Sequence, residues 1–125
     1  HQELGYRNIW RIQMKEAKEV FNVLSSELSI RILRLVVGRG EPVCVCEFAT
    51  ALERPSYEIS KSLKQLRKIS FLCSKRRGKY NYYSVQKIND AAKAVVFDVV
   101  AKLKDEIFKE DLNRFVKEVC SVKKR

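Results

Sequence analysis

The spacing of hydrophobic residues changes along the chain and divides it into helical and strand-like segments. Apolar residues recur at helical spacing over 6–24, which predicts a first helix. Ser25 or Ser26 is typical of a helix N-cap and predicts the start of a second helix. Gly38 and Gly40 predict its end, because glycine readily adopts the left-handed conformation that terminates helices.

Two further helices follow closely on one another. The pattern predicts a short helix from about Cys44 to Leu52 and another from Pro55 to about Lys68 or Ile69. Proline suits the first turn of a helix, where its missing N–H costs nothing. The inward-facing stripe of the second of these helices is Ile59, Leu63, Leu66 and Ile69.

The periodicity then changes from that of a helix to that of a strand. Residues 71–75 and 79–85 alternate and are rich in aromatic and β-branched residues, which predicts two strands. The hairpin tip is expected at Arg76-Arg77-Gly78, with glycine supplying a positive φ. A helical pattern returns from Ile88 to about Val119 and predicts one long final helix.

The predicted order α-α-α-α-β-β-α is mainly helical with a small β-hairpin, in the α+β class. Two short helices joined by a tight turn and followed by a hairpin indicate a winged helix-turn-helix. The two terminal helices have more apolar surface than one small core can cover, so we expect a homodimer formed through them. The expected organisation is a single domain over 1–125, with an N-terminal dimerisation helix at 1–24, the helix-turn-helix at 43–69, the wing at 71–85 and a C-terminal dimerisation helix at 88–120.

Charge is concentrated on the predicted helix-turn-helix and wing. The 125-residue chain has 26 basic and 15 acidic residues, a net charge of +11. Between Ile59 and Asn89 there are nine basic residues and no acidic one. Lys123, Lys124 and Arg125 add three more, and the rest of the chain is nearly balanced. Such a concentrated basic surface is typical of proteins that bind a polyanion, most often nucleic acid.

The predicted partner is double-stranded DNA. A helix fits the major groove, where exposed Lys and Gln side chains can reach base edges. Lys68 and the basic residues of the wing are expected to hold phosphates or enter the minor groove. The candidate DNA-binding residues are Ser56, Tyr57, Ser60, Lys61, Lys64, Gln65, Lys68, Lys75, Arg76, Arg77 and Lys79.

The middle of the chain resembles the ArsR/SmtB family of winged-helix, metal-responsive repressors. The resemblance spans roughly Leu24 to Val85 and rests on the segments SELSIRILRLV, VCVCEFATAL, ISKSLKQLRK and SKRRGKYNYYSV. It implies a homodimer that binds an operator with an inverted repeat and dissociates when an inducer binds. The Cys-Val-Cys segment resembles the thiolate site of members that sense arsenic, antimony, cadmium or lead, and it implies ligands at Cys44 and Cys46.

Thiolates suit soft metal ions, and the single histidine, His1, excludes an imidazole-rich site. Residues two apart point in nearly opposite directions on a helix, so the pair can chelate together only if Cys44 precedes the helix or the first turn unwinds. Placement at a helix N-terminus is expected to lower the pKa of a thiol and to favour metal capture. Arsenite or antimonite is the expected inducer, with cadmium or lead as alternatives.

The third ligand differs from the family pattern. Trigonal arsenite ligation requires three thiolates, and the position that supplies the third in arsenic sensors is Ala49 here. Cys120 or Cys73 could provide it, although free cysteines are also common as small buried residues. An alternative hypothesis keeps DNA binding and makes the thiols redox-sensing or inert.

Other functional classes have less support. The sequence shows no nucleophile–histidine pair and no glycine-rich phosphate loop, so we do not expect an enzyme. A winged helix that binds RNA or a protein is a further alternative. No apolar run is long enough to cross a membrane and no secretory-signal pattern is present, so we expect a cytoplasmic protein.

Overall fold

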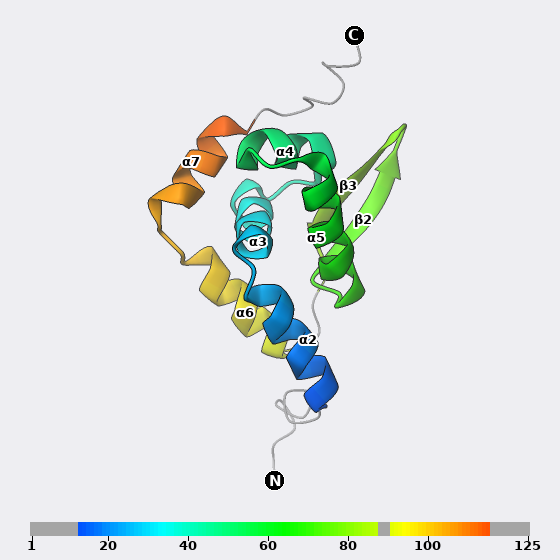
Figure 1. Ribbon diagram of the computed structural model, residues 1–125, viewed down its shortest axis with the longest axis vertical. Coiled ribbons are helices and arrows are strands. Elements are labelled where there is room, and N and C mark those ends of the chain that lie inside the picture. The colour runs from blue at the N-terminus through cyan, green and yellow to red at the C-terminus, as the bar shows by residue number, and fades with distance from the viewer. Residues whose placement is uncertain (1–12, 88–90, 116–125) are drawn as a thin grey trace.

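The computed structural model of this chain describes residues 13–87 and 91–115 (Figure 1). It is mostly helical with a small antiparallel sheet, which confirms the predicted fold class. Residues 6–12 of the first predicted helix and 116–120 of the last lie outside the described residues. The elements in chain order are α2 (Met14–Leu24), α3 (Glu27–Arg39), β1 (Val43–Cys44), α4 (Val45–Leu52), α5 (Ser56–Lys68), β2 (Leu72–Arg77), β3 (Tyr80–Val85), α6 (Ala91–Ala101) and α7 (Glu106–Arg114).

Local capping chemistry explains the boundaries of α3. The Ser26 side chain accepts a hydrogen bond from the backbone N–H of Ser29, which satisfies one of the donors left without a partner at a helix start. Gly40 ends the helix in the left-handed conformation, with φ of 67°. The predicted start at Ser26 and end at Gly40 are confirmed, whereas Gly38 lies inside the helix.

Helices α4 and α5 form the predicted helix-turn-helix. Glu53 ends α4 in the left-handed conformation, with φ of 55°, and only three residues separate the two helices. Pro55 is the N-cap of α5, one position before the expected start of the helix. Helix α5 packs on α3, α4 and β2, so its orientation depends on all three.

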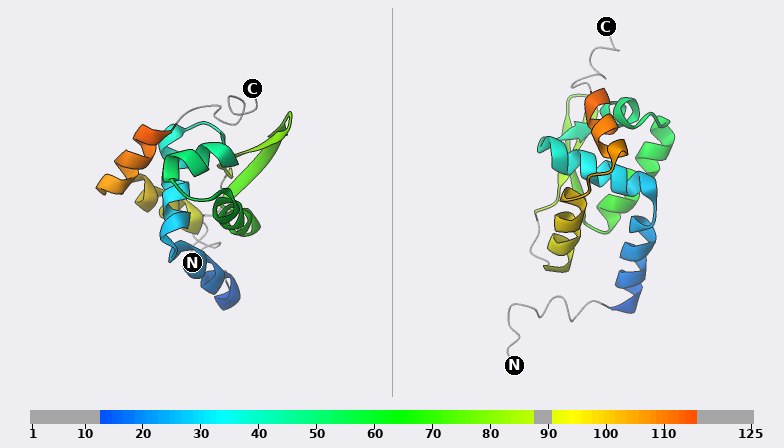
Figure 2. Two further views of the ribbon diagram at one scale, coloured as in Figure 1. Left: turned by 45° about the horizontal axis from the view of Figure 1, so that its top comes forward. Right: turned by 90° about the vertical axis from the view of Figure 1, so that its left-hand side faces the viewer.

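The sheet has three strands rather than the two that were predicted. Its order is β1-β3-β2, and the short β1 pairs Val43 with Tyr83 and Cys44 with Tyr82. In the hairpin, Arg77 is still paired with Tyr80, so the tip is at Gly78, with φ of 62°, and Lys79. The hairpin extends outward beside α5 (Figure 1 and Figure 2).

The prediction of one long final helix was wrong. The structure has two helices, α6 and α7, separated by Lys102–Asp105. Helix α7 turns back onto α3 and α4 instead of continuing along α6 (Figure 1). The apolar pattern runs across the break because both helices have faces to bury, so periodicity alone did not reveal it.

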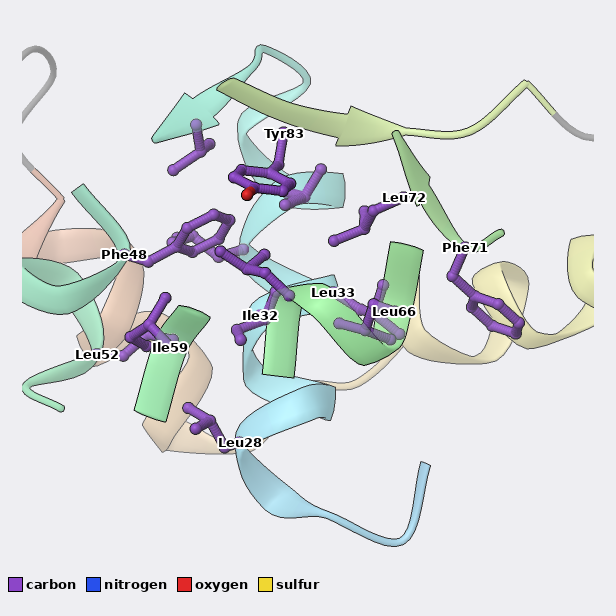
Figure 3. Close-up of a cluster of buried hydrophobic side chains, with 14 of the residues drawn as sticks. Leu28, Ile32, Leu33, Phe48, Leu52, Ile59, Leu66, Phe71, Leu72 and Tyr83 are labelled. Atoms are coloured by element: carbon purple, nitrogen blue, oxygen red, sulfur yellow. The ribbon is translucent and has the colours of Figure 1, made fainter. Parts of the chain in front are cut away.

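The core lies between α3, the helix-turn-helix and the sheet. Figure 3 shows side chains from all three pointing into one interior. Each removes apolar surface from water, at about 25 cal/mol per Å². This shared core fixes the helix-turn-helix to the rest of the domain. The labelled members of the cluster are Leu28, Ile32, Leu33, Phe48, Leu52, Ile59, Leu66, Phe71, Leu72 and Tyr83.

Candidate nucleic-acid interface and thiol site

Helix α5 has one buried and one exposed face. Ile59, Leu63 and Leu66 are fully buried, which follows from their spacing of three and four residues. The opposite face is open to solvent, and Tyr57 is 73% exposed. Every candidate DNA-contacting residue on the helix is exposed, namely Ser56, Tyr57, Ser60, Lys61, Lys64, Gln65 and Lys68.

The wing places four further cations beside this helix. Lys75, Arg76, Arg77 and Lys79 are all exposed. The Arg77 guanidinium lies 4.8 Å from the centroid of the Tyr82 ring, and Arg76 Nε donates to the Gly78 carbonyl oxygen at 3.2 Å. These contacts orient the two arginines without neutralising their charge, so both remain able to bind phosphate.

Within residues 13–87 and 91–115, the seven candidate DNA-binding cations of α5 and the wing form no ion pair with a carboxylate. The carboxylate at the start of α5, Glu58, pairs with Arg54 at 2.6 Å. The surface is therefore an unneutralised cationic one, which we name the basic face. It consists of Lys61, Lys64, Lys68, Lys75, Arg76, Arg77 and Lys79.

Two cysteines lie together at the start of α4. Cys44 ends β1 and is the N-cap of α4, with the extended backbone angles φ −99° and ψ 168°. It therefore precedes the helix, which is one of the two arrangements that would let the pair chelate together. Cys44 is 1% exposed and packs with Cys46, Tyr80 and Tyr82. Pairing of β1 with β3 is what brings the two tyrosines to the thiols.

Glu47 holds this arrangement and was missed by the sequence analysis. Its Oε1 accepts the backbone N–H of Cys44 at 3.0 Å, and the Cys44 side chain accepts the backbone N–H of Glu47. The carboxylate is almost fully buried, at 1% exposed. An acidic residue three positions after an N-cap is the signature of such a reciprocal capping pair and could have revealed the role.

Burial raises the pKa of the Cys44 thiol, although the backbone N–H of Glu47 opposes this effect. The expectation of a lowered pKa was therefore wrong for Cys44. Removing the thiol from water disfavours its anion more than the helix N-terminus stabilises it. A metal ion that binds here must displace the thiol proton.

The candidate third ligands are not joined to the pair in the described structure. Cys73 lies on β2, which β3 separates from β1, so the two outer strands are about 9.6 Å apart. Cys73 pairs with Ser84, two residues along β3 from Tyr82, the partner of Cys44, so the two cysteines are offset along the strands as well as separated across the sheet. Cys120 lies outside the described residues.

Two more observations concern metal binding. Within the described parts of the chain, no group of three or more His, Cys, Asp or Glu side chains is placed to hold a metal ion. Cys46 is disulfide-bonded, so its sulfur can bind a metal only after reduction.

Comparison with curated proteins identifies regulators of arsenic resistance. The chain is 27% identical to the arsenical resistance operon repressor of Escherichia coli, over 82% of this chain and 87% of that protein. It is 39% identical to the arsenic resistance transcriptional regulator ArsR1 of Pseudomonas putida, over 51% of this chain. That match spans about half of the relative, 49% of its length. No protein-family model matches the chain.

Among solved structures, reduced HlyU from Vibrio cholerae has a similar fold. The TM-score is 0.56 at 16% identity, over 70% of this chain and 92% of that one. This likeness supports the winged-helix fold. The relatives' names confirm the resemblance to the ArsR repressors. No helix in the described residues is long and apolar enough to span a bilayer.

Proposed function

We propose that this chain is a DNA-binding transcriptional repressor of the ArsR type that works in the cytoplasm. The observation that carries the proposal is the basic face: α5 packs against β2, and both carry exposed cations that have no carboxylate partner among the described residues. Helix α5 would enter the major groove, where Lys64 and Gln65 read guanine and adenine edges. Lys75 and the wing arginines would hold the phosphate backbone.

The release signal proposed for this repressor is a soft metal or metalloid. Arsenite or antimonite is favoured because the named relatives are arsenic-resistance regulators, with cadmium and lead as the alternatives. Cys44 and Cys46 would supply two thiolates in the reduced protein, since they lie together at the start of α4. Ligation there would pull on the first turn of α4 and disturb the helix that supports α5.

A homodimer would present two copies of the basic face to an inverted repeat. The support is apolar surface left uncovered on α2 and α6. Phe21 is 72% exposed, and Val95 and Val99 are each 58% exposed. The two helices border one hollow, lined by Val20, Phe21 and Val96 among other residues. Pairing of this surface with a second copy would remove it from water.

The test begins with selection of an operator from a random duplex library. Binding of that duplex to reduced protein is then titrated with arsenite, antimonite, cadmium and lead. The same titrations are made with the Cys44→Ser/Cys46→Ser double variant and with Cys73→Ser as a matched control. Release of the wild type and of Cys73→Ser, but not of the double variant, is expected. Equal release of all three would contradict sensing by the pair.

A redox signal is the second candidate function. The observation that favours it is that Cys46 is disulfide-bonded. Under this alternative, oxidised and reduced protein differ in operator affinity without any metal, and Cys46→Ser abolishes the difference. Mass spectrometry after mild oxidation, set against metal stoichiometry on the reduced protein, distinguishes the two signals.

A further inference from the structure

Both ends of α4 are held by buried carboxylates. Among the described residues the buried acidic side chains are Glu47, at the N-terminal end, and Asp111, which lies on α7 beside the C-terminal end. Glu47 belongs to the thiol site described above, whereas Asp111 has no part in it. A charge in the interior is costly unless it is paired, so the surroundings of Asp111 indicate what holds it there.

Asp111 is bound by two arginines. Arg31 of α3 donates through Nε to Oδ2 at 2.9 Å and through a terminal nitrogen to Oδ1 at 2.6 Å. Arg114 donates to Oδ1 at 2.8 Å. Asp111 is 2% exposed and the Arg31 side chain 11% exposed, so water competes weakly for these bonds. The hydrogen bond to Asp111 also raises the pKa of Arg31.

The same two arginines cap the C-terminal end of α4. A terminal nitrogen of Arg31 donates to the Leu52 carbonyl at 2.8 Å, and Arg114 Nε donates to the Ala51 carbonyl at 2.8 Å. These are the last carbonyls of an eight-residue helix, and helix ends leave such groups without intrahelical donors. The negative end of the helix dipole also favours cations there. One carboxylate on α7 therefore organises two caps on α4.

We propose that Asp111 is a positioning residue for DNA binding. Through Arg31 and Arg114 it fixes the C-terminal end of α4, and with it the three-residue turn that leads into α5. Helix α7 thereby acts as a clamp on the helix-turn-helix (Figure 2). A disturbance at the N-terminal thiols of α4 then moves the helix as a unit, because its far end cannot fray to absorb the change. The link to DNA rests on the proposed function, whereas the clamp itself does not.

The test compares Asp111→Asn with Glu110→Gln, which removes the same charge from the neighbouring, exposed position. Hydrogen exchange is followed at two helix-ending amides. Glu53 donates to Ala49 at the clamped end of α4, and Gly40 donates to Val36 at the end of α3. In Asp111→Asn we expect about tenfold faster exchange at Glu53 and no change at Gly40, because opening is local. Glu110→Gln changes neither amide.

Affinity for the selected operator is measured on the same proteins. Asp111→Asn is expected to bind several-fold more weakly than wild type at a temperature where both are folded, and Glu110→Gln is expected to bind equally. If Asp111→Asn does not fold, Arg114→Gln replaces it, because Arg114 is partly exposed and its loss leaves the Arg31–Asp111 pair in place.

Three results would overturn the proposal. Equal acceleration at both amides would indicate a general loss of stability, and no acceleration would show that the caps do not hold α4. Local acceleration with unchanged operator affinity would remove the positioning role. Failure of the wild type to select any operator would instead contradict the proposed function, and the exchange measurements would still decide whether the clamp exists.

Discussion

The wing arginines provide the most direct test of the basic face. Arg76 and Arg77 lie next to the hairpin tip, are exposed, and have no carboxylate partner among the described residues. Replacing either with alanine removes one charge and leaves the ladder hydrogen bonds of β2 intact, because these are backbone bonds. Lys109→Ala, an exposed position on α7, removes the same charge outside the basic face and serves as the control.

The expected change in the salt dependence of binding follows from counterion release. Each phosphate contact contributes about 0.9 to the slope of log affinity against log salt concentration, independently of sequence. The seven cations of the basic face therefore set a ceiling of about six units per protomer. Each wing substitution should lower the slope by about 0.9 in a protomer, or about 1.8 in a dimer. At physiological salt this corresponds to about 1 kcal/mol of binding free energy per contact.

The assay is fluorescence anisotropy on a labelled mixed-sequence duplex, titrated between about 50 and 200 mM salt. No operator is needed, because the phosphate contribution is the same for any sequence. Arg76→Ala and Arg77→Ala should each flatten the slope, and Lys109→Ala should leave it unchanged. If all three variants gave the wild-type slope, the wing would not contact phosphate and the division of roles within the basic face would be wrong. A wing variant that lost discrimination between sequences while keeping the wild-type salt slope would equally refute this division of roles.

Three other predictions test α5, the thiol site and the core. Lys64→Ala or Gln65→Ala should weaken binding to the selected operator by about 1–3 kcal/mol, and binding to a random duplex by much less, in the same anisotropy assay. Equal losses of binding free energy on both duplexes would mean that neither residue reads bases. Because burial raises the pKa of Cys44, its thiol is protonated at neutral pH, and a bound Cd²⁺ ion must displace the proton. The Cd²⁺ affinity of the reduced protein, measured by thiolate absorption, should therefore rise about tenfold per pH unit for each displaced proton. An affinity that does not change with pH would exclude Cys44 as a ligand. The buried Ser29 and Ser62 hydroxyls are 3.0 Å apart, so replacing either serine with alanine should lower the free energy of unfolding by about 1–3 kcal/mol, measured by urea unfolding. The double variant should lose less than the sum of the two single losses. Additive losses would show that the hydroxyls do not interact.

The sequence predicted those elements whose ends are set by local chemistry. Ser26 and Gly40 bound α3 because a serine oxygen accepts an N–H at a helix start and a glycine adopts a positive φ at its end. Gly78 marks the hairpin turn for the same reason. The exposed face of α5 follows from the spacing of Ile59, Leu63 and Leu66, so the exposure of the candidate DNA-contacting residues could be predicted without the structure.

The thiol site was only half predictable. The sequence located the pair and stated that Cys44 must precede the helix or the first turn must unwind. Pairing of Cys44 with Tyr82 on a strand distant in the sequence decided that it precedes the helix. The direction of its pKa shift was predicted incorrectly, because the helix terminus is visible in the sequence whereas the burial that outweighs it is not.

Sequence alone therefore determined the ends of α3, the helix-turn-helix, the hairpin and the basic charge of the outer face, since caps, turns and periodicity act between near neighbours. Tertiary structure decided that the final helical pattern breaks at Lys102–Asp105, that α7 folds back on α4, and that Asp111 is buried between two arginines. Those outcomes depend on which surfaces cover one another, and contacts between residues as far apart as Arg31 and Asp111 leave no local pattern in the sequence.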